Sequence, residues 1–178
     1  MRSSGSDSVG SISTPERGFS MIEVLITLLV FSIGLLGMGA MYAQSLSISH
    51  NTYLRSLASI QAADMDERIR ANPWAAADAY VMDGTQCLGL GSGAASVAVP
   101  VAPVDCATAS CAVSQTVSWD LEQWCSANID LFGGLFASAA ITSTSGDYQI
   151  DLNWQERVSE QNNQRSIETR GFSYRLTP

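Results

Sequence analysis

A single carboxylate, Glu23, stands at the edge of a long apolar segment. The 21 residues from Val24 to Gln44 contain no charged side chain. A carboxylate at that depth in a membrane is costly unless it becomes neutral or finds a cation. The next arginine along the chain is Arg55, which is beyond the reach of the same part of the helix. The partner of Glu23 is therefore expected outside this segment, and a newly exposed N-terminal amine nearby would serve.

The other residues with chemical potential are four cysteines, Cys87, Cys106, Cys111 and Cys125, which all follow the apolar segment. An even number in one stretch favours two disulfides in an oxidising compartment. Zinc is the competing interpretation, but Cys106 and Cys111 lack CxxC spacing and the only histidine, His50, is far away. Three pairings are possible. We prefer Cys106–Cys111, which closes a short loop, with Cys87–Cys125 tying that loop region to a later helix.

The apolar segment, residues 24–44, has the length and composition of a membrane span. As a helix it would reach roughly 31 Å, close to the hydrocarbon thickness of about 30 Å. A secretory signal peptide fits less well, because its apolar core is usually shorter and ends at a small-residue cleavage site. Arg17 directly precedes the segment, so the positive-inside tendency places the first residues in the cytoplasm and the cysteines outside. This topology agrees with the expected disulfides.

The stretch RGFSMIEVL resembles the cleavage and methylation motif of type IV prepilins. The resemblance implies that a prepilin peptidase removes residues 1–18, cuts between Gly18 and Phe19, and methylates the amine of Phe19. Glu23 is then the fifth residue of the mature chain. The family implies that its carboxylate pairs with the N-terminal ammonium of a neighbouring subunit during filament assembly. Either charge alone would be costly to bury, so the pair would set one axial register.

A stem helix is expected over residues 19–72. Beyond Gln44 its pattern becomes amphipathic, with one apolar face formed by Leu54, Ala58, Ala62, Met65 and Ile69. Two i,i+4 ion pairs are expected on its outer surface, Asp64 with Arg68 and Asp66 with Arg70. Asn72 precedes Pro73, which disfavours helix and predicts an end near Ala71. This stem, half in the membrane and half amphipathic, is the pilin architecture.

Two further stretches resemble PilV-type minor pilins, also called type IV pilus modification proteins. Residues 62–73, AADMDERIRANP, are similar to a pattern common in those proteins, and VSWDLEQW places Asp120 and Trp124 as another of their elements does. No catalytic role is implied for either stretch. A solvated helix end with a capping arrangement is the simpler interpretation of residues 62–73.

Residues 73–178 are expected to form a small α+β head. Glycines and two prolines argue against regular structure over much of residues 75–117. A helix is predicted from Ala112 to Phe132, with Val117, Leu121, Trp124 and Asn128 on one face and Gly133-Gly134 as its stop. Three antiparallel strands should follow, at residues 135–144, 148–155 and 165–176. Ser145-Gly146-Asp147 forms the first turn, residues 156–164 form the second, and Gly171 suggests a bulge.

These features predict a structural subunit: a minor pilin of a type IV pilus that helps to prime or cap filament assembly. The implied partners are major and other minor pilins, through the N-terminal helix, together with the prepilin peptidase and the inner-membrane assembly machinery. The chain would be anchored once in the inner membrane with its head in the periplasm, and later lie in the filament at the cell surface, a setting associated with adhesion and twitching motility. A minor pseudopilin of a type II secretion system would carry the same motif.

Two other functional classes are less well supported. A tip adhesin could use the long loop of the head for recognition. DNA uptake is disfavoured by the formal net charge of −8 and the absence of lysine, because such a surface repels phosphates. An enzyme is not expected. No Ser-His-Asp or Cys-His set is available, because the single His50 falls on the stem helix. Asp120 and Glu122 point in different directions on a helix, and no cofactor or metal is implied.

Overall fold

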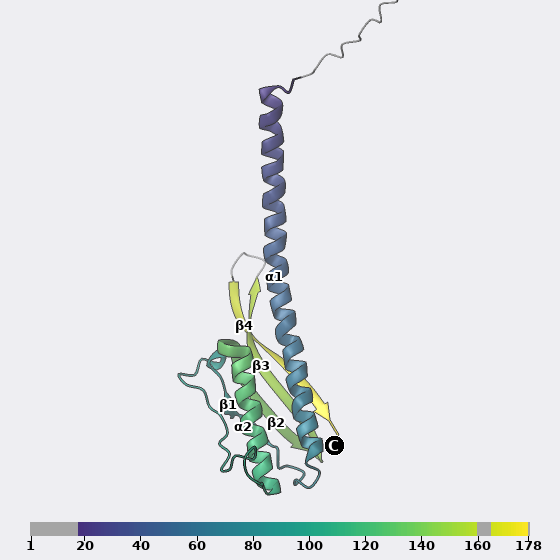
Figure 1. Cartoon of the computed structure of the whole chain (residues 1–178), viewed down its shortest axis with the longest axis vertical. Coiled ribbons are helices and arrows are strands. Elements are labelled where there is room, and N and C mark those ends of the chain that lie inside the picture. Colours follow the sequence, from purple (N-terminus) through teal and green to yellow (C-terminus); the bar gives the residue numbers. More distant parts are fainter. Residues whose placement is uncertain (1–17, 160–164, 178) are drawn as a thin grey trace, which may run out of the picture. The chain divides into compact units, whose positions relative to one another are not determined.

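The computed structural model describes residues 18–159 and 165–177, so the expected leader lies, apart from Gly18, outside the described residues. The chain divides into two compact units, Met1–Gln44 and Ser45–Pro178. Helix α1, Met21–Ala71, runs through this boundary. Figure 1 shows the elements of the second unit in colours that follow the sequence. The expected combination of a long N-terminal helix with an antiparallel sheet is confirmed.

The part of α1 that belongs to the second unit packs as its amphipathic pattern predicts. The five apolar residues predicted to face the head are all buried: Leu54, Ala58, Ala62, Met65 and Ile69. The helix ends at Ala71, before Asn72 and Pro73. Both predicted ion pairs form, but Asp66 is buried rather than on the outer surface. The second carboxylate oxygen of Asp66 accepts a hydrogen bond from the hydroxyl of Tyr174, a residue of the sheet, at 3.0 Å. This contact accounts for the burial of Asp66.

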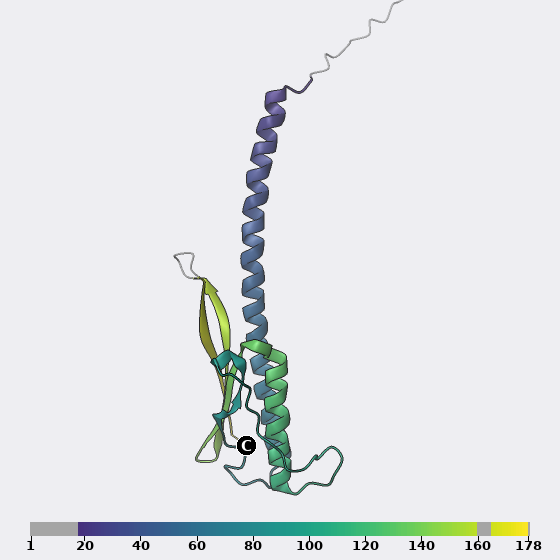
Figure 2. The same ribbon diagram turned by 90° about the vertical axis from the view of Figure 1, so that its left-hand side faces the viewer.

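The sheet of the second unit has four antiparallel strands in the order β1-β2-β3-β4. Helix α2 and two single 3₁₀ turns, η1 and η2, complete the described elements of this unit. Figure 2 shows α2 and the second half of α1 on the same side of the sheet. The bounds are β1 Met82–Leu88, η1 Leu90–Ser92, α2 Val113–Phe132, η2 Gly133–Leu135, β2 Phe136–Thr144, β3 Asp147–Ser159 and β4 Arg165–Leu176.

Strand β1 corrects the expectation of three strands, whereas much of residues 75–117 lacks regular structure, as predicted. Its sequence, MDGTQCL, has no alternation of apolar and polar residues, so no strand signal was visible. It pairs with β2 at only three positions and contains a register shift, because Met82 lies opposite Ile141 and Cys87 opposite Ala139. Long-range pairing and a disulfide at Cys87 therefore hold this strand, rather than local propensity.

The last hairpin differs from its prediction in two ways. Strand β3 continues to Ser159, although residues 156–164 were expected to turn the chain. Strands β3 and β4 also pair without a shift from Tyr148–Leu176 to Ser159–Arg165, so the predicted bulge at Gly171 is wrong. The apparent change of phase arises because Ile167 simply lies on the solvent side, where it is exposed. A glycine is favoured at position 171 for a steric reason instead, because a Cβ there would lie 2.8 Å from the Asn153 side-chain oxygen.

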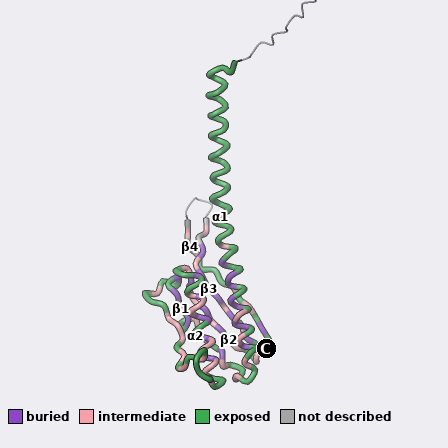
Figure 3. Tube along the Cα trace, viewed as in Figure 1, coloured by how far each residue is buried: buried purple, intermediate pink, exposed green. Residues whose placement is uncertain are grey.

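The turn between β2 and β3 and the second helix follow the predictions closely. Ser145 and Gly146 both have positive φ, as tight two-residue hairpin turns require. Helix α2 ends at Phe132, before Gly133 with φ 58°. Its predicted face is buried, and the core of the unit forms where this face, α1 and the inner side of the sheet meet, as Figure 3 shows by colour. Phe132 contacts both Phe136 and Trp154, with ring centroids 5.9 and 5.7 Å apart.

Gly89 and Gly91, in the stretch GLGSG (residues 89–93), allow two backbone segments to approach each other closely. A Cβ at Gly91 would lie 2.6 Å from the Phe136 carbonyl oxygen and would also collide with the Leu135 carbonyl oxygen. Replacing Gly91 by alanine should therefore lower the free energy of unfolding by about 1–3 kcal/mol, measured by urea unfolding of the full chain in detergent. Gly134→Ala is the control, since a Cβ there meets nothing within 4 Å. Equal stability of the two variants would contradict the steric argument.

Candidate functional site

The expected processing site lies directly before the first turn of α1. Gly18 and Phe19 precede the helix without regular secondary structure, and Phe19 is 83 % exposed. A Cβ at Gly18 would meet nothing within 4 Å. Helix α1 then begins with the Ser20 carbonyl accepting the N–H groups of Glu23 and Val24, at 3.0 and 3.3 Å. The peptide bond between Gly18 and Phe19 is thus free of packing contacts with the described part of the chain.

Glu23 lies in the first turn of α1 and is exposed. The helix N-terminus favours a negative charge there, because the free N–H groups give it a partial positive charge. Glu23 is in none of the ion pairs formed within residues 18–159 and 165–177. With no cation partner among the described residues, the carboxylate at this helix end is available to a group from outside the chain.

The first half of α1 exposes apolar side chains all round. Every residue from Met21 to Gln44 is exposed, including Leu25, Leu29 and Phe31. Within the described residues, α1 is the helix that is long and apolar enough to cross a membrane. Two of its hydroxyls are satisfied within the helix, since Thr27 and Ser32 donate to the carbonyls of Val24 and Leu28. This surface suits lipid or other apolar helices.

In the second unit, α1 and α2 are joined by a polar network around Asp120. Arg68 Nη1 donates to one carboxylate oxygen of Asp120 at 3.3 Å, and the Tyr80 hydroxyl donates to the other at 2.7 Å. Asn72 Nδ2 in turn donates to the Tyr80 hydroxyl at 3.3 Å. Burial raises the pKa of Tyr80 far above the ordinary value, and the hydrogen bond to the Asp120 carboxylate raises this pKa further. The network connects the end of α1, the following loop and α2.

The raised pKa of Tyr80 should make the stability of the second unit depend on pH in the alkaline range. The folded state holds the Tyr80 proton more tightly than the unfolded state, whose tyrosines titrate near pH 10. The free energy of unfolding should therefore decrease as the pH rises above about 10, and more gently in Tyr80→Phe than in the unmodified chain. Urea unfolding of the full chain in detergent at pH 9 and pH 11 measures the difference. Equal pH slopes for both chains would argue against a tightly held phenol proton.

A second contact between the helices involves Trp124, which is fully buried. Its indole Nε1 donates to the Gln61 backbone carbonyl of α1 at 2.7 Å. One turn further along α2, the buried Asn128 donates from Nδ2 to the Trp124 carbonyl at 2.8 Å. The two stretches that resemble PilV-type proteins thus contact each other through Arg68 and Asp120, and Trp124 binds just before the first of them. Their described contacts are structural links between α1 and α2.

Sequence reasoning missed Glu156, a carboxylate on the inner side of β3. Its side chain is only 2 % exposed and accepts a hydrogen bond from Trp154 Nε1 at 3.0 Å. Arg55 of α1 and Arg170 of β4 supply positive charge at 3.4 and 3.9 Å. The sequence did contain a signal for its burial, because every second residue from Tyr148 to Trp154 faces inward and residue 156 continues this alternation. The polar composition of the following residues hid it by suggesting a turn.

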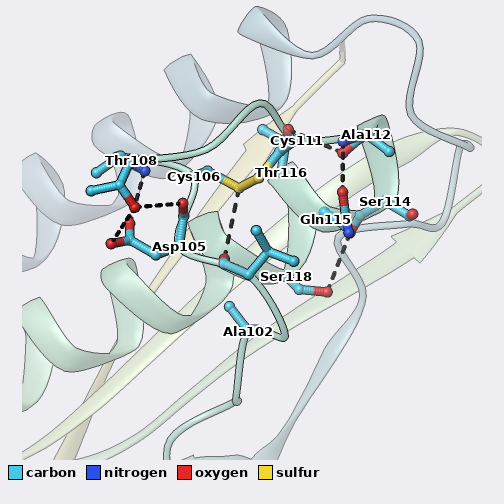
Figure 4. Close-up of a disulfide and its surroundings, with 12 residues drawn as sticks. Ala102, Asp105, Cys106, Thr108, Cys111, Ala112, Ser114, Gln115, Thr116 and Ser118 are labelled. Carbon is cyan, nitrogen blue, oxygen red and sulfur yellow. Dashed lines mark hydrogen bonds between the residues drawn. A yellow bond between two sulfur atoms is a disulfide. The ribbon is translucent and has the colours of Figure 1, made fainter.

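The four cysteines form two disulfides in the second unit. Cys87 is bonded to Cys125, which ties the end of β1 to α2, and both are fully buried. Cys106 is bonded to Cys111 across a short loop before α2, shown in Figure 4. These are the two pairs preferred from the sequence. Asp105 orders the start of the small loop, because its carboxylate accepts the Ala107 N–H at 2.9 Å.

Residues that could have formed a catalytic or metal site do not converge. Asp120 faces Arg68 and Tyr80, whereas Glu122 accepts the Ala102 N–H at 2.9 Å. His50 is exposed on α1. In the described part of the chain, no three His, Cys, Asp or Glu side chains come together as metal ligands would.

Comparison with known proteins identifies the N-terminal segment. Residues 14–39 match the prokaryotic N-terminal methylation motif, a stretch that includes Gly18, Phe19, Glu23 and most of the apolar half of α1. No match was found among curated proteins or among solved structures. The motif, together with the apolar helix beside it, indicates membrane anchoring and processing by a prepilin peptidase. The chain thus has a type IV pilin-like N-terminus, followed by an α+β unit that is consistent with the pilin fold.

Proposed function

We propose that this chain is a minor pilin of a type IV pilus, of the PilV type. It is inserted in the inner membrane through residues 24–44, with residues 73–178 forming a periplasmic head. The leader is removed between Gly18 and Phe19, the Phe19 amine is methylated, and the mature chain enters the filament, where it primes or caps assembly. The observation that carries this proposal is the methylation motif at the start of a helix whose apolar first half, residues 21–44, is exposed on all sides.

Assembly through Glu23 follows from the charges of the mature N-terminus. A carboxylate that has no ion pair with the described residues and an N-terminal ammonium on the same short stretch cannot both remain unpaired in lipid. In a filament, the ammonium of one subunit and Glu23 of its neighbour satisfy each other and fix the axial position of the two stems. Partners are other pilins, met through the helix from Phe19 to Gln44.

The PilV assignment is supported by the contacts of the two stretches that resemble such proteins. Asp120 binds Arg68, and Trp124 binds the carbonyl next to residues 62–73. A shared sequence pattern at both places is what a common packing of α1 on α2 would require, without any catalytic role.

Mass spectrometry of the mature protein tests the scheme. In cells that contain a prepilin peptidase, the N-terminus should be N-methylated Phe19, and Gly18→Val should leave the precursor uncut. An intact Met1 in such cells would overturn the proposal.

Fractionation then distinguishes pilus from secretion system. A pilus subunit should appear in sheared surface filaments, and its deletion should reduce their number. A deletion that leaves filaments unchanged but blocks protein secretion would identify the chain as a minor pseudopilin instead.

A further inference from the structure

Strand β1 is an edge strand that covers β2 in the sheet order β1-β2-β3-β4. Met82 and Cys87, near its two ends, are buried. The residues between them do not pair with β2 and form a local turn instead, in which the Asp83 carboxylate accepts the Thr85 N–H at 2.7 Å. The disulfide from Cys87 to Cys125 therefore ties the later half of a weakly paired strand to α2.

Strand β2, which β1 covers, has the composition of an edge that binds other strands. Its residues, FASAAITST, include no charged side chain, no proline and no glycine. An uncovered edge of this kind offers unpaired N–H and C=O groups to another chain. In the folded head β1 meets this need close to the disulfide, because the Gly89 N–H donates to the Ala137 carbonyl of β2 at 3.0 Å.

The two outer edges of the finished sheet carry the protection that β2 lacks. Strand β4 contains three arginines and Glu168. Strand β1 contains Asp83, Gly84 and a register shift. Charges and irregular pairing of this kind keep an edge strand from pairing with other chains. The unprotected strand of the sheet is therefore hidden only while β1 stays in place.

We propose that the Cys87–Cys125 disulfide controls access to the edge of β2, and that in chains without this bond the edge binds β2 of a second copy. Two identical strands without charges pair antiparallel with no like charges opposed. Formation of the bond passes two electrons and two protons from the two thiols to a disulfide donor, which becomes a dithiol. Both cysteines are fully buried once bonded, so the open edge belongs to chains that have not yet been oxidised.

Amide hydrogen exchange of the full chain in detergent, followed by mass spectrometry, tests the opening of β1. Cys87→Ala combined with Cys125→Ala removes the bond without leaving a free thiol. The amides of β1, and those of β2 that face it, should then exchange about a hundredfold faster or more, because the cross-link that limits their separation is gone. The β3–β4 hairpin should stay protected.

The other disulfide supplies the matched control. Cys106→Ala combined with Cys111→Ala removes a bond that closes only a short loop before α2. This double variant also loses two cysteines, but β1 should exchange as slowly as in the unmodified chain.

Analytical ultracentrifugation of the same chains in detergent tests the proposed occupant. The chain without Cys87 and Cys125 should form dimers at a concentration at least about tenfold lower than the unmodified chain. Ala140 is half-buried between the fully buried Ala139 and Ile141 and pairs with Asp151, so its side chain lies on the outer side of β2. Adding Ala140→Arg should abolish the additional dimers while β1 still exchanges rapidly, because the charge protects the exposed edge.

The remaining outcomes overturn the inference. Slow exchange of β1 without the bond would show that packing alone holds the strand. Rapid exchange throughout β3 and β4 would show that the bond holds the whole unit rather than one edge. Rapid exchange of β1 without dimers, or with dimers that Ala140→Arg leaves unchanged, would exclude β2 of a second copy as the occupant. Each of these results is independent of processing at Phe19, which tests the proposed function.

Discussion

Replacement of Glu23 by alanine is expected to leave the chain in the membrane and remove it from sheared filaments. The apolar segment that anchors the helix is unchanged, so insertion should be normal. The incoming ammonium of a neighbouring subunit, however, would be buried without its carboxylate, and removing one partner of a buried ion pair costs about 3–5 kcal/mol. Incorporation should therefore fall by about a hundredfold or more, measured by immunoblotting membranes and sheared filaments from the same cells.

Two control variants distinguish the effect of losing the Glu23 charge from the effect of changing side-chain size on this helix. Glu23→Gln keeps the size of the side chain but loses the charge, and should fail like alanine. Thr27→Ala, one turn along α1, removes a hydroxyl that bonds only to the Val24 carbonyl of its own helix, and should be incorporated normally. Normal amounts of Glu23→Ala in filaments would defeat the charge-pairing mechanism.

The second large effect is expected at Trp124, where replacement by alanine should destabilise the head by about 3–5 kcal/mol. The side chain is fully buried between α1 and α2, and its loss removes both the packing and the indole donor to the Gln61 carbonyl. Trp124→Phe keeps most of the packing and loses the hydrogen bond, so a smaller cost of about 1–2 kcal/mol is expected. Urea unfolding of the full chain in detergent, followed by circular dichroism, measures both.

The same pair of variants tests whether the contact is structural. The proposed methylation site, Phe19, precedes the N-terminal end of α1, far along the helix from Gln61, so both variants should still be processed at the membrane. A Trp124→Ala chain as stable as the unmodified one would show that the indole contributes little to joining the helices.

The elements with strong local periodicity could be predicted from the sequence. The end of α1 at Ala71, the buried face from Leu54 to Ile69, and helix α2 with its stop at Gly133 all followed from apolar spacing and from glycine or proline signals. Each of these signals is local, because the residues that decide them are within a few turns of one another.

Strand β1 could not be predicted, because nothing in its own residues favours a strand. Its pairing depends on β2, which lies beyond α2 in the chain, and on the disulfide from Cys87 to α2. The extension of β3 was missed for a related reason. Glu156 is charged but buried, and its burial is made acceptable by the arginines of α1 and β4 and by the hydrogen bond from the Trp154 indole.

The residues of the candidate site also fall into a group that could be predicted from the sequence and a group that could not. Gly18, Phe19 and Glu23 are close together in sequence, so their arrangement follows from the order of the residues alone. The contacts of Asp120 do not, since Arg68 and Tyr80 come from two other segments. An aspartate on an amphipathic helix gives no indication of which distant residue it meets.

The placement of the links between α1 and α2 has a mechanical consequence. Contacts of α1 with α2 and the sheet are spread along the helix, from Arg55 with Glu156 to Arg70 with the Thr177 carbonyl. A pull along the axis of α1 would therefore load them in shear, all together, rather than one after another as in unzipping. The head should accordingly resist tension along its own helix far better than tension applied across it.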